Sequence, residues 1–374
     1  MSTALDDDQL PRQQHSPPGC DCETVTPAPA VTRLALHGRT THVQRKLQQL
    51  LHAHDVPVTV TDAAFLVADD HFLQLEEMLT AFTSTEQAEV LAAPGHEGRV
   101  SVWQAAPLST WLARRASAWF HDATKHLVFH LQPIVRLTDG TIHGYEALVR
   151  AQLGERFIGA GPLLSAAASH DRARSFDALA RREAIRQAYP KLQRGETLFI
   201  NFAPGVVYNP DICLQTTFQA CRAYGADFSR LLFEVTESEA FPDLRLLGRI
   251  LERYRAEGAR VALDDLGAGH TSLTYLQVLR PDVVKLDRAL IAGLRDGDAR
   301  VPLVQALVTY AHDLGVEVVA EGIETPEELE LVASFGTDFA QGYLLGRPAA
   351  DVNGVTADVS ARLAALTSGM PASG

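Results

Sequence analysis

The sequence predicts an α/β fold: a (β/α)8 TIM-like barrel whose first strand runs antiparallel, preceded by a small N-terminal α+β domain. The chain has 374 residues, of which 46% are hydrophobic, and this length is typical of two domains with full cores. After about residue 126, eight short apolar runs alternate with amphipathic segments of helical length, a number and spacing typical of a (β/α)8 barrel. We therefore assign 126–360 to the barrel and 31–106 to the smaller domain.

The composition narrows the possible functions. The net charge of -13 argues against binding to a nucleic-acid polymer, which needs a basic face to neutralise phosphates. No uncharged apolar run approaches the roughly 18 residues of a membrane span. Acidic residues 6–8 stand where a signal peptide would be basic and then apolar. We expect a cytoplasmic protein, in which any anionic ligand would be attracted by a bound metal ion.

Residues 1–30 are polar and rich in proline, so we expect a disordered tail. Cys20 and Cys22 lie in this tail. A metal site there would need two further ligands nearby, so two free thiols are the favoured interpretation, and the role of the pair stays open. In the following domain, the spacing of apolar residues predicts strand, helix, strand and helix in turn, at 31–36, 43–51, 56–67 and 72–82.

Residues 107–125 are predicted to form one helix that links the two domains, with Ser109 or Thr110 as its N-cap. We expect its aromatic residues Trp111 and Trp119 to pack against neighbours rather than to form a ligand cage.

The eight barrel runs are rich in β-branched and aromatic residues. The first two are joined only by 137–142, which is too short for a parallel crossover, whereas Asp139-Gly140 is a strong hairpin signal. The first strand is therefore expected to run antiparallel to its neighbour. A later helix begins with a capping box at 325–328 and ends at Gly336, and 361–374 are expected to be a flexible C-terminus. The runs lie at 128–135, 143–149, 198–202, 231–235, 260–264, 283–286, 316–321 and 338–343.

Charged and amide side chains stand within or at the ends of nearly all these runs. In a barrel the C-terminal ends of the strands meet on one face, so these side chains are expected to share a single cleft. Burying carboxylates without cations costs several kcal/mol per unpaired ion, and one lysine cannot compensate for five acids. Divalent cations can, and these oxygen ligands suit Mg²⁺ or Mn²⁺. The residues are Glu146, Asn201, Glu234, Asp264, Asp265, Lys285, Glu321 and Gln341.

An alternative is that acids at strand ends cap the following helices, because Asp and Glu favour helix N-termini. This accounts for single positions such as Glu237 and Glu324 but not for the adjacent Asp264 and Asp265, so we favour a metal centre. Two ions roughly 3.5–4 Å apart, bridged by Asp264, would lower the pKa of a shared water towards 7. Hydrolysis of a phosphodiester fits such a centre best, although these residues alone do not name the substrate.

The same residues stand in blocks that resemble the EAL-domain family of cyclic di-GMP phosphodiesterases. The resemblance runs from about residue 126 to 350 in unbroken order and includes the signature Glu146-Ala147-Leu148. The order of all eight blocks, rather than any one of them, carries the resemblance. The blocks are LQPIVRL, YEALVR, FINFAP, FEVTE, LDDLGAGHTSL, VVKLD, VVAEGIET and QGYLLGRP.

The resemblance implies a role for each matching residue. Glu146, Asn201, Glu234 and Asp264 would ligate one ion, and Asp264 and Asp265 the second, with Glu321 as a further ligand or base. Lys285 would orient the attacking water or the phosphate, and Glu237 would steady the loop after Asp265. The implied catalytic set is Glu146, Lys285, Glu321 and Glu237, the substrate contacts are Gln132, Leu148, Arg150, Asp287 and Gln341, and the loop positions are Gly267, Gly269 and Thr271.

In the family this loop couples the metal site to a dimer interface, so a homodimer is implied. The sequence departs from the family pattern at Ala151, Leu266 and His270. None of the three is an implied metal ligand, and the departures bear on loop rigidity, substrate stacking and rate rather than on the chemistry. His270 is better interpreted as a surface or packing residue than as a proton donor.

The expected function is hydrolysis of one phosphodiester bond of cyclic di-GMP to linear pGpG with two Mg²⁺ or Mn²⁺ ions, which lowers the second messenger. The alternative is an inactive barrel that binds cyclic di-GMP as a receptor, although the acids that inactive relatives usually lack are present here. A third possibility is an active barrel that acts mainly as a scaffold through its N-terminal domain, which we expect to be regulatory or dimerising. The sequence leaves open the signal, its direction, the preferred metal, the turnover rate and the biological output.

Overall fold

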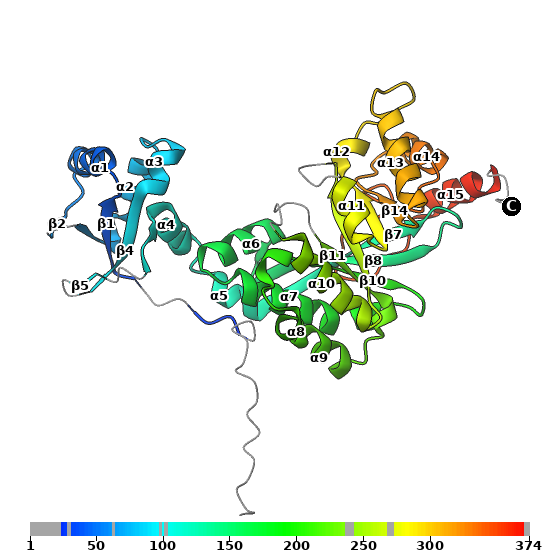
Figure 1. Cartoon of the computed structure of the whole chain (residues 1–374), viewed down its shortest axis with the longest axis horizontal. Coiled ribbons are helices and arrows are strands. Elements are labelled where there is room, and N and C mark those ends of the chain that lie inside the picture. Colours follow the sequence, from blue (N-terminus) through cyan, green and yellow to red (C-terminus); the bar gives the residue numbers. More distant parts are fainter. Residues whose placement is uncertain are drawn as a thin grey trace, which may run out of the picture.

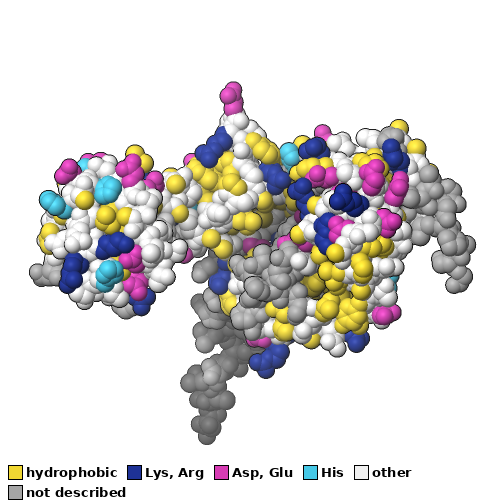
Figure 2. Space-filling view, turned by 90° about the horizontal axis from the view of Figure 1, so that it is seen from above, with side chains coloured by type: hydrophobic (Ala, Val, Ile, Leu, Met, Phe, Trp, Pro, Cys, Tyr) yellow, Lys and Arg dark blue, Asp and Glu magenta, His cyan; other side chains and the backbone are white. Residues whose placement is uncertain are grey.

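The computed structural model describes residues 24–27, 31–61, 64–96, 99–100, 104–235, 243–267 and 273–369. These residues form two separate sheets, a six-stranded one near the N-terminus and a nine-stranded one that closes into a barrel. Figure 1 shows the two units side by side along the long axis of the molecule, and a narrow waist joins them in the space-filling view (Figure 2). The predicted fold class is confirmed. The predicted tail, with Cys20 and Cys22, lies outside the described residues except for 24–27.

The N-terminal unit is an antiparallel sheet with the order β2-β3-β1-β4-β5, and β6 pairs with β4. Leu34 and Leu36 are two positions apart on β1 and therefore share one face, which packs with Leu47 of α1 and Leu75 of α2 in one buried cluster. The elements are β1 (Arg33–Gly38), α1 (Thr41–Ala53), β2 (Thr59–Val60), β3 (Phe65–Ala68), η1 (Asp69–His71), α2 (Phe72–Leu79), α3 (Ser84–Glu89), β4 (Val90–His96), β5 (Arg99–Val100) and β6 (Ala106–Pro107).

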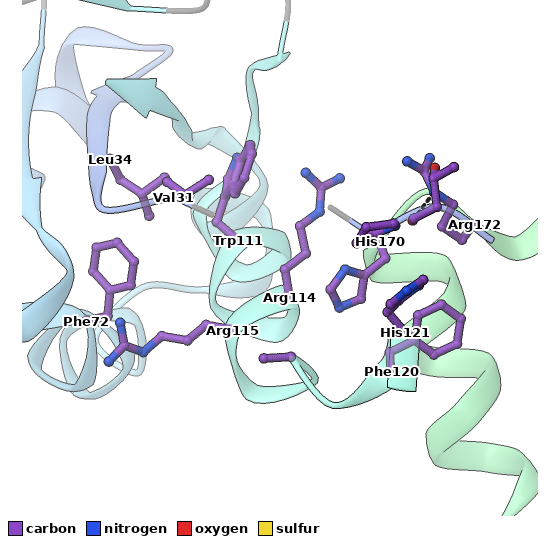
Figure 3. Close-up of a pocket in the computed structure, with 13 residues that line it drawn as sticks. Val31, Leu34, Phe72, Trp111, Arg114, Arg115, Phe120, His121, His170 and Arg172 are labelled. Atoms are coloured by element: carbon purple, nitrogen blue, oxygen red, sulfur yellow. Dashed lines mark hydrogen bonds between the residues drawn. The ribbon is translucent and has the colours of Figure 1, made fainter. Parts of the chain in front are cut away.

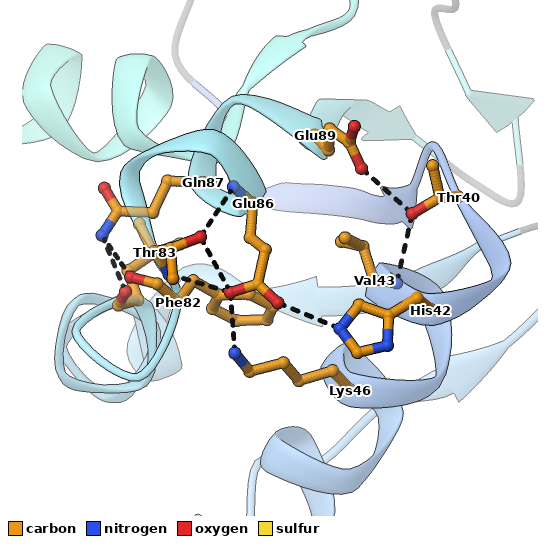
Figure 4. A network of polar contacts seen from close by, with 10 residues as sticks. Thr40, His42, Val43, Lys46, Phe82, Thr83, Glu86, Gln87 and Glu89 are labelled. Atoms are coloured by element: carbon orange, nitrogen blue, oxygen red, sulfur yellow. Dashed lines mark hydrogen bonds and ion pairs between the residues drawn. The ribbon is translucent and has the colours of Figure 1, made fainter.

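Glu86 links two helices of this unit (Figure 4). A capping box begins α3, because the Thr83 side chain accepts from the Glu86 amide while the Glu86 carboxylate accepts from the Thr83 amide at 2.8 Å. The same carboxylate accepts from Lys46 Nζ at 2.8 Å and lies 3.1 Å from Nε2 of His42, both on α1. The Lys46 contact is the largest of the effects that lower the pKa of Glu86 to about 2. One side chain thereby joins α3 to α1.

The prediction of a single helix over 107–125 is wrong. Helix α4 (Leu108–Ala116) ends at Ser117, and a short α5 (Phe120–Ala123) follows the break. Ser117 has φ -108° and ψ 29°, and its hydroxyl donates to the Ala113 carbonyl at 2.5 Å and lies 3.1 Å from Nε2 of His170. A serine hydroxyl that bonds to backbone carbonyls in this way weakens the continuation of a helix.

The start of this segment also differs from the prediction. The N-cap of α4 is Pro107 rather than Ser109 or Thr110, because β6 extends to Pro107 and the helix begins directly after it. The segment is shared between two cores, since Trp111 belongs to the buried cluster of the N-terminal unit and Phe120 to that of the barrel. Trp111 therefore packs, as predicted.

The barrel closes through the strand order β7-β8-β10-β11-β12-β13-β14-β15, with β15 paired to β7. The predicted antiparallel first strand is confirmed, because β7 is antiparallel to both β8 and β15, and Gly140 turns the hairpin with a φ of 71°. The strands are β7 (Leu127–Arg136), β8 (Ile142–Leu153), β9 (Arg156–Ile158), β10 (Thr197–Phe202), β11 (Leu231–Val235), β12 (Arg260–Leu266), β13 (Val283–Leu286), β14 (Glu317–Ala320) and β15 (Phe339–Gln341).

Helices surround this ring of strands (Figure 1). The predicted capping box at 325–328 and the stop at Gly336, with its φ of 81°, are both confirmed. The helices are η3 (Thr124–His126), α6 (Ala160–Ser169), α7 (Ala173–Gln187), η4 (Tyr189–Lys191), η5 (Pro204–Val206), α8 (Pro210–Cys213), α9 (Gln215–Ala223), η6 (Phe228–Arg230), α10 (Leu244–Ala256), α11 (Leu273–Leu279), α12 (Arg288–Ile291), α13 (Val301–Asp313), α14 (Pro326–Ser334) and α15 (Ala357–Gly369).

The predicted flexible C-terminus is corrected by α15, which covers most of 361–374 and leaves only 370–374 outside the described residues. Val359 and Leu363 are four positions apart on this helix, and both are buried in the barrel cluster. A short apolar stripe at helical spacing thus holds the segment against the barrel. Within the described ranges, every helix is too short or too polar to cross a bilayer.

Candidate active site

The inward-facing side chains of the barrel form layers. One layer is apolar and buried, and it consists of Ile134, Phe199, Leu232, Ala262, Val283, Val319 and Phe339. Positions two residues apart on a strand point to the same side. The next inward positions towards the C-terminal ends of the parallel strands are therefore Asn201, Glu234, Asp264, Lys285, Glu321 and Gln341, which are residues predicted to share a cleft.

Lys285 lies at the centre of this polar layer, and only 1% of its side chain is exposed. Its Nζ lies 2.5 Å from Oε1 of Glu321 and 3.0 Å from Oε1 of Glu234. The same Nζ is 3.4 Å from Oδ1 of Asp264 and 3.6 Å from Oε2 of Glu146. These acids come from β8, β11, β12 and the end of β14, so closure of the barrel brings them to one ammonium group.

Glu146 is held by two amides as well as by Lys285. Asn201 Nδ2 donates to Oε1 of Glu146 and Gln341 Nε2 donates to Oε2, both at 2.7 Å, and the Gln341 amide also lies 3.2 Å from Oε1 of Gln132. Burial by itself would raise the pKa of Glu146, but Lys285 and the two amides outweigh burial and lower the pKa below its usual value. Glu146 is therefore ionised at neutral pH.

Asp264 and Asp265 both face the cleft because β12 is irregular. In a regular strand their side chains would point to opposite faces. The pairing of β12 with β13 shifts register between Leu263 and Leu266, and Asp265 has a φ of 58°, which is uncommon for a residue other than glycine. As a result, carboxylate oxygens of Asp264, Asp265 and Glu321 all lie within 4.8 Å of one another.

The remaining acids bind protons more tightly than usual. Burial, reinforced by neighbouring carboxylates, raises the pKa of Glu234 and of Asp264, raises the pKa of Asp265 to about 6 and raises that of Glu321 to about 8. Burial would lower the pKa of Lys285, but the surrounding carboxylates hold that pKa well above its usual value. The buried polar layer thus holds its acids in excess over Lys285, which stays protonated among them.

The donor set fits divalent cations. Glu234 is fully buried, and apart from the ion pair of its Oε1 with Lys285 at 3.0 Å, its carboxylate oxygens accept no hydrogen bond from the described part of the chain. Oε1 of Gln341 is also buried and likewise accepts no hydrogen bond from these residues. Carboxylate and amide oxygens of this kind are the ligands that Mg²⁺ and Mn²⁺ take, and the three clustered oxygens of Asp264, Asp265 and Glu321 add to them.

The polar layer opens into a cleft of about 230 Å³. Besides the predicted residues, its wall contains Arg288, Glu324 and Tyr343, which were not predicted as site residues. Nη2 of Arg288 lies 2.8 Å from Oε1 of Glu324, so Glu324 pairs with an arginine and does not act as the predicted helix cap. The sequence could have indicated Arg288 as a site residue, because Arg288 lies just after the strand end that carries Lys285.

Two glycines allow the cleft wall to pack closely. A Cβ on Gly342 would lie 2.1 Å from the carbonyl oxygen of Ile323, and one on Gly322 would lie 2.4 Å from Cγ of Arg288. Gly322 also has a φ of 70°, which disfavours any side chain.

The other predicted residues lie at the margin of the cleft or outside the described chain. Leu148 and Arg150 follow Glu146 on the same face of β8, towards the margin of the cleft. Asp287 caps α12 by accepting from a backbone amide at 2.7 Å. Gly267 has a φ of 106°, and a Cβ there would approach a leucine side chain at 2.5 Å. The predicted residues Glu237, Gly269 and Thr271, together with His270, lie outside the described residues.

This fold and cleft define an α/β barrel protein with a carboxylate-rich site at the C-terminal ends of its strands. The chain belongs to the EAL domain family, whose model matches residues 115–348.

Relatives in this family include cyclic di-GMP phosphodiesterases. The bifunctional diguanylate cyclase/cyclic di-GMP phosphodiesterase MucR of Pseudomonas aeruginosa is 31% identical over 228 residues, which cover 60% of this chain and 33% of MucR. The cyclic di-GMP phosphodiesterase NbdA of the same organism is 30% identical over 226 residues, which cover 59% of this chain and 29% of NbdA. The chain thus spans about a third of the length of these curated relatives.

Solved structures are similar over the barrel. A standalone EAL protein from Vibrio cholerae O395, in a c-di-GMP bound form, is 30% identical with a TM-score of 0.56 and covers 63% of this chain and 97% of its own. The MucR phosphodiesterase in complex with c-di-GMP is 31% identical with a TM-score of 0.54 and covers 60% and 97%. BlrP1 of Klebsiella pneumoniae, at 19% identity and a TM-score of 0.57, shares the fold over 87% of this chain and 98% of its own, a likeness that extends beyond the barrel.

Proposed function

We propose that this chain hydrolyses one phosphodiester bond of cyclic di-GMP to give linear pGpG, with two Mg²⁺ or Mn²⁺ ions bound. The observation that carries the proposal is the convergence of five carboxylates in one cleft of an EAL barrel, four of them within 3.6 Å of Nζ of Lys285 and the fifth, Asp265, beside Asp264 and Glu321. The relatives named for this activity match over the same barrel, which supports cyclic di-GMP as the substrate.

Glu146, Asn201, Glu234 and Asp264 would hold one ion, and Asp264, Asp265 and Glu321 the other. When bound, such ions lower the pKa of water and neutralise charge that develops on phosphate oxygens. Their positive charge also removes the repulsion between the acidic cleft and an anionic substrate.

The side chains of this chain would position the substrate and its protons. The amides of Asn201 and Gln341 hold both oxygens of Glu146 in place. Lys285 would keep its proton and stabilise negative charge on the scissile phosphate. With bound cations lowering the raised pKa of Glu321, its Oε1, 2.5 Å from Nζ of Lys285, would accept a proton from the attacking water as the P–O bond to the leaving ribose oxygen breaks, and that oxygen would take its proton from solvent. Arg288 at the wall offers a guanidinium group to a phosphate, a pairing favoured by its planar geometry.

The test is chromatographic detection of pGpG from the purified full chain with cyclic di-GMP and either Mg²⁺ or Mn²⁺. Glu146→Gln keeps the shape of the side chain but removes the charge, so we expect hydrolysis to fall by about 10–100-fold or more. Glu183→Gln is the matched control, because Glu183 pairs with Arg186 on α7 and is outside the cleft. A folded wild type that releases no pGpG with either metal contradicts the proposal, and tight binding of cyclic di-GMP without hydrolysis would favour the receptor alternative.

We also propose a cytoplasmic homodimer that forms through the loop after Asp265, with the N-terminal unit as a regulatory or dimerising module. Leu273 and Val278 support this, because they lie on α11 directly after the loop and are 47% and 57% exposed. Light scattering on the full chain and on the double variant Leu273→Glu/Val278→Glu tests it. A wild type that is monomeric at micromolar concentration contradicts the dimer.

A further inference from the structure

A pocket at the junction of the two units is separate from the barrel cleft. Its volume is about 340 Å³, which falls within the range of roughly 300–1,000 Å³ typical of small-molecule sites. Leu34, Phe72 and Trp111 line it from the N-terminal unit, and Phe120, His170 and Arg172 line it from the barrel side (Figure 3). A ligand in this pocket would therefore contact both units.

The walls of the pocket consist of flat groups stacked in pairs. The guanidinium carbon of Arg114 lies 4.4 Å from the ring centroid of Trp111, and that of Arg115 lies 5.0 Å from the ring centroid of Phe72. On the barrel side, the rings of Phe120 and His170 stack 5.5 Å apart with an angle of 18°. The rings of Phe72 and Phe120 are only 3% and 1% exposed, so a planar ligand would stack on the guanidinium groups that lie over such rings, of which Arg115 is exposed. Guanidinium groups stack well on planar rings, so the shape of the pocket favours a flat ring system.

The charge of the pocket favours an anion. Three arginines line it, and none of its thirteen lining residues, all in the described part of the chain, is acidic, although the chain has a net charge of -13. Arg114 pairs with Asp171, which lies outside the lining, so the charge available to a ligand comes from Arg115 and Arg172. Arg172 uses Nε and Nη1 on backbone carbonyls at 3.2 Å, and Arg115 uses Nη1 on a carbonyl at 2.8 Å. A guanidinium group has five N–H donors, so these contacts leave donors for a ligand.

One further polar atom supports a ligand site. Nδ1 of His121 is buried and has no hydrogen-bond partner among the described residues, and His121 lies beside His170 in the pocket wall (Figure 3). A buried nitrogen without a partner is costly unless a ligand or water satisfies it. The N–H of Trp111, by contrast, already donates to the carbonyl of Ala92 at 2.9 Å, which fixes the indole ring as part of the wall.

We propose that this pocket binds a small planar aromatic anion, either a nucleoside monophosphate or an aromatic carboxylate. The two classes share the chemistry that the pocket recognises: a flat ring stacks against the arginine and aromatic layers, and one anionic group meets the free guanidinium donors.

The first test measures equilibrium binding to the full chain in EDTA, by calorimetry, with GMP and indole-3-acetate as probes. Their uncharged analogues, guanosine and indole-3-acetamide, are the matched controls. We expect saturable binding of at least one anion, about tenfold tighter than its uncharged analogue, because a hydrogen bond to a charged group is lost in the analogue. Binding of only one anion identifies the ligand class. Absence of binding by both anions, or equal affinity for anion and analogue, overturns the proposal.

The second test locates the probe. Arg172→Gln is expected to weaken binding about tenfold, and Ala118→Trp to abolish it, because Ala118 is an exposed lining residue and the larger side chain would fill the pocket. Arg174→Gln is the matched control, since Arg174 stacks on Tyr208 outside the pocket. Circular dichroism verifies the fold of each variant. Binding that survives Ala118→Trp but is lost in Glu146→Gln would place the probe in the barrel cleft and overturn the proposal.

Discussion

Replacement of Lys285 by methionine is expected to destabilise the barrel through the loss of one charge. The side chain is 1% exposed, and its Nζ lies within 3.6 Å of four carboxylates, so methionine keeps most of the volume but leaves these acids without their cation. Removal of one partner from a buried ion pair costs about 3–5 kcal/mol of unfolding free energy. Because carboxyl groups can take up protons to relieve the repulsion, we expect a loss near 3 kcal/mol in EDTA at pH 8.

The size of this loss is expected to depend on pH. Burial already raises the pKa of Glu321 to about 8 and that of Asp265 to about 6, and removal of Lys285 raises these pKa values further. The folded variant then binds more protons than the unfolded chain, so its stability rises as the pH falls. The difference in unfolding free energy between wild type and variant should therefore shrink between pH 8 and pH 5.5.

Urea unfolding followed by far-UV circular dichroism measures both effects by linear extrapolation. Lys191→Met is the control, because Lys191 is 38% exposed and faces one carboxylate, that of Asp351, at 3.6 Å. Such a surface pair is worth less than about 1 kcal/mol. A loss below about 1 kcal/mol for Lys285→Met at pH 8, or a loss that grows as the pH falls, would refute the reasoning.

Local geometry makes three further predictions. Burial, with Arg136, lowers the pKa of His143 from 6.5 to about 4, so the stability contributed by the neutral imidazole is complete above pH 6.5 and is lost as the pH falls towards 4. Between pH 7 and 4, wild type should therefore lose up to about 3 kcal/mol more unfolding free energy than His143→Phe. Equal losses in the two proteins would contradict this prediction. Thr325→Ala removes the capping box and should cost about 1 kcal/mol in urea unfolding, so an unchanged midpoint would count against the cap. Gly342→Ala puts a Cβ 2.1 Å from a carbonyl oxygen of the cleft wall and should slow the formation of pGpG about tenfold or more. Gly354→Ala is the control, because a Cβ at Gly354 meets open space and should leave the rate unchanged. Equal rates for the two variants would contradict the close packing at Gly342.

Much of the barrel could be predicted from local patterns. A spacing of two residues puts Phe199 and Asn201 on one face of a strand wherever the strand lies, and Asp139-Gly140 turns a hairpin through its own backbone preferences. The capping box at 325–328 likewise involves only residues within one helical turn. These features depend on neighbours in the chain, which the sequence displays directly.

The errors of prediction fall where distant groups decide the outcome. The helix that starts after Pro107 ends at Ser117, whose hydroxyl contacts His170, a residue 53 positions away. The C-terminal segment is a helix because Leu363 is buried against the barrel. Arg288 follows β13 and Glu324 follows β14, and Arg288 reaches the cleft because these two strands are neighbours in the barrel.

By itself, the amino-acid sequence determined which residues face the barrel interior and which family motifs carry them, because side-chain direction repeats every two residues along a strand. Only the tertiary structure decided that Asp264 and Asp265 both face the cleft, that four acids share Lys285, and that a pocket lies between the two units. Three features decide these outcomes: the irregular strand register, the protonation of buried acids and the shape of the pocket. Each depends on atoms that are close in space but distant in sequence, and a local sequence pattern gives no information about such contacts.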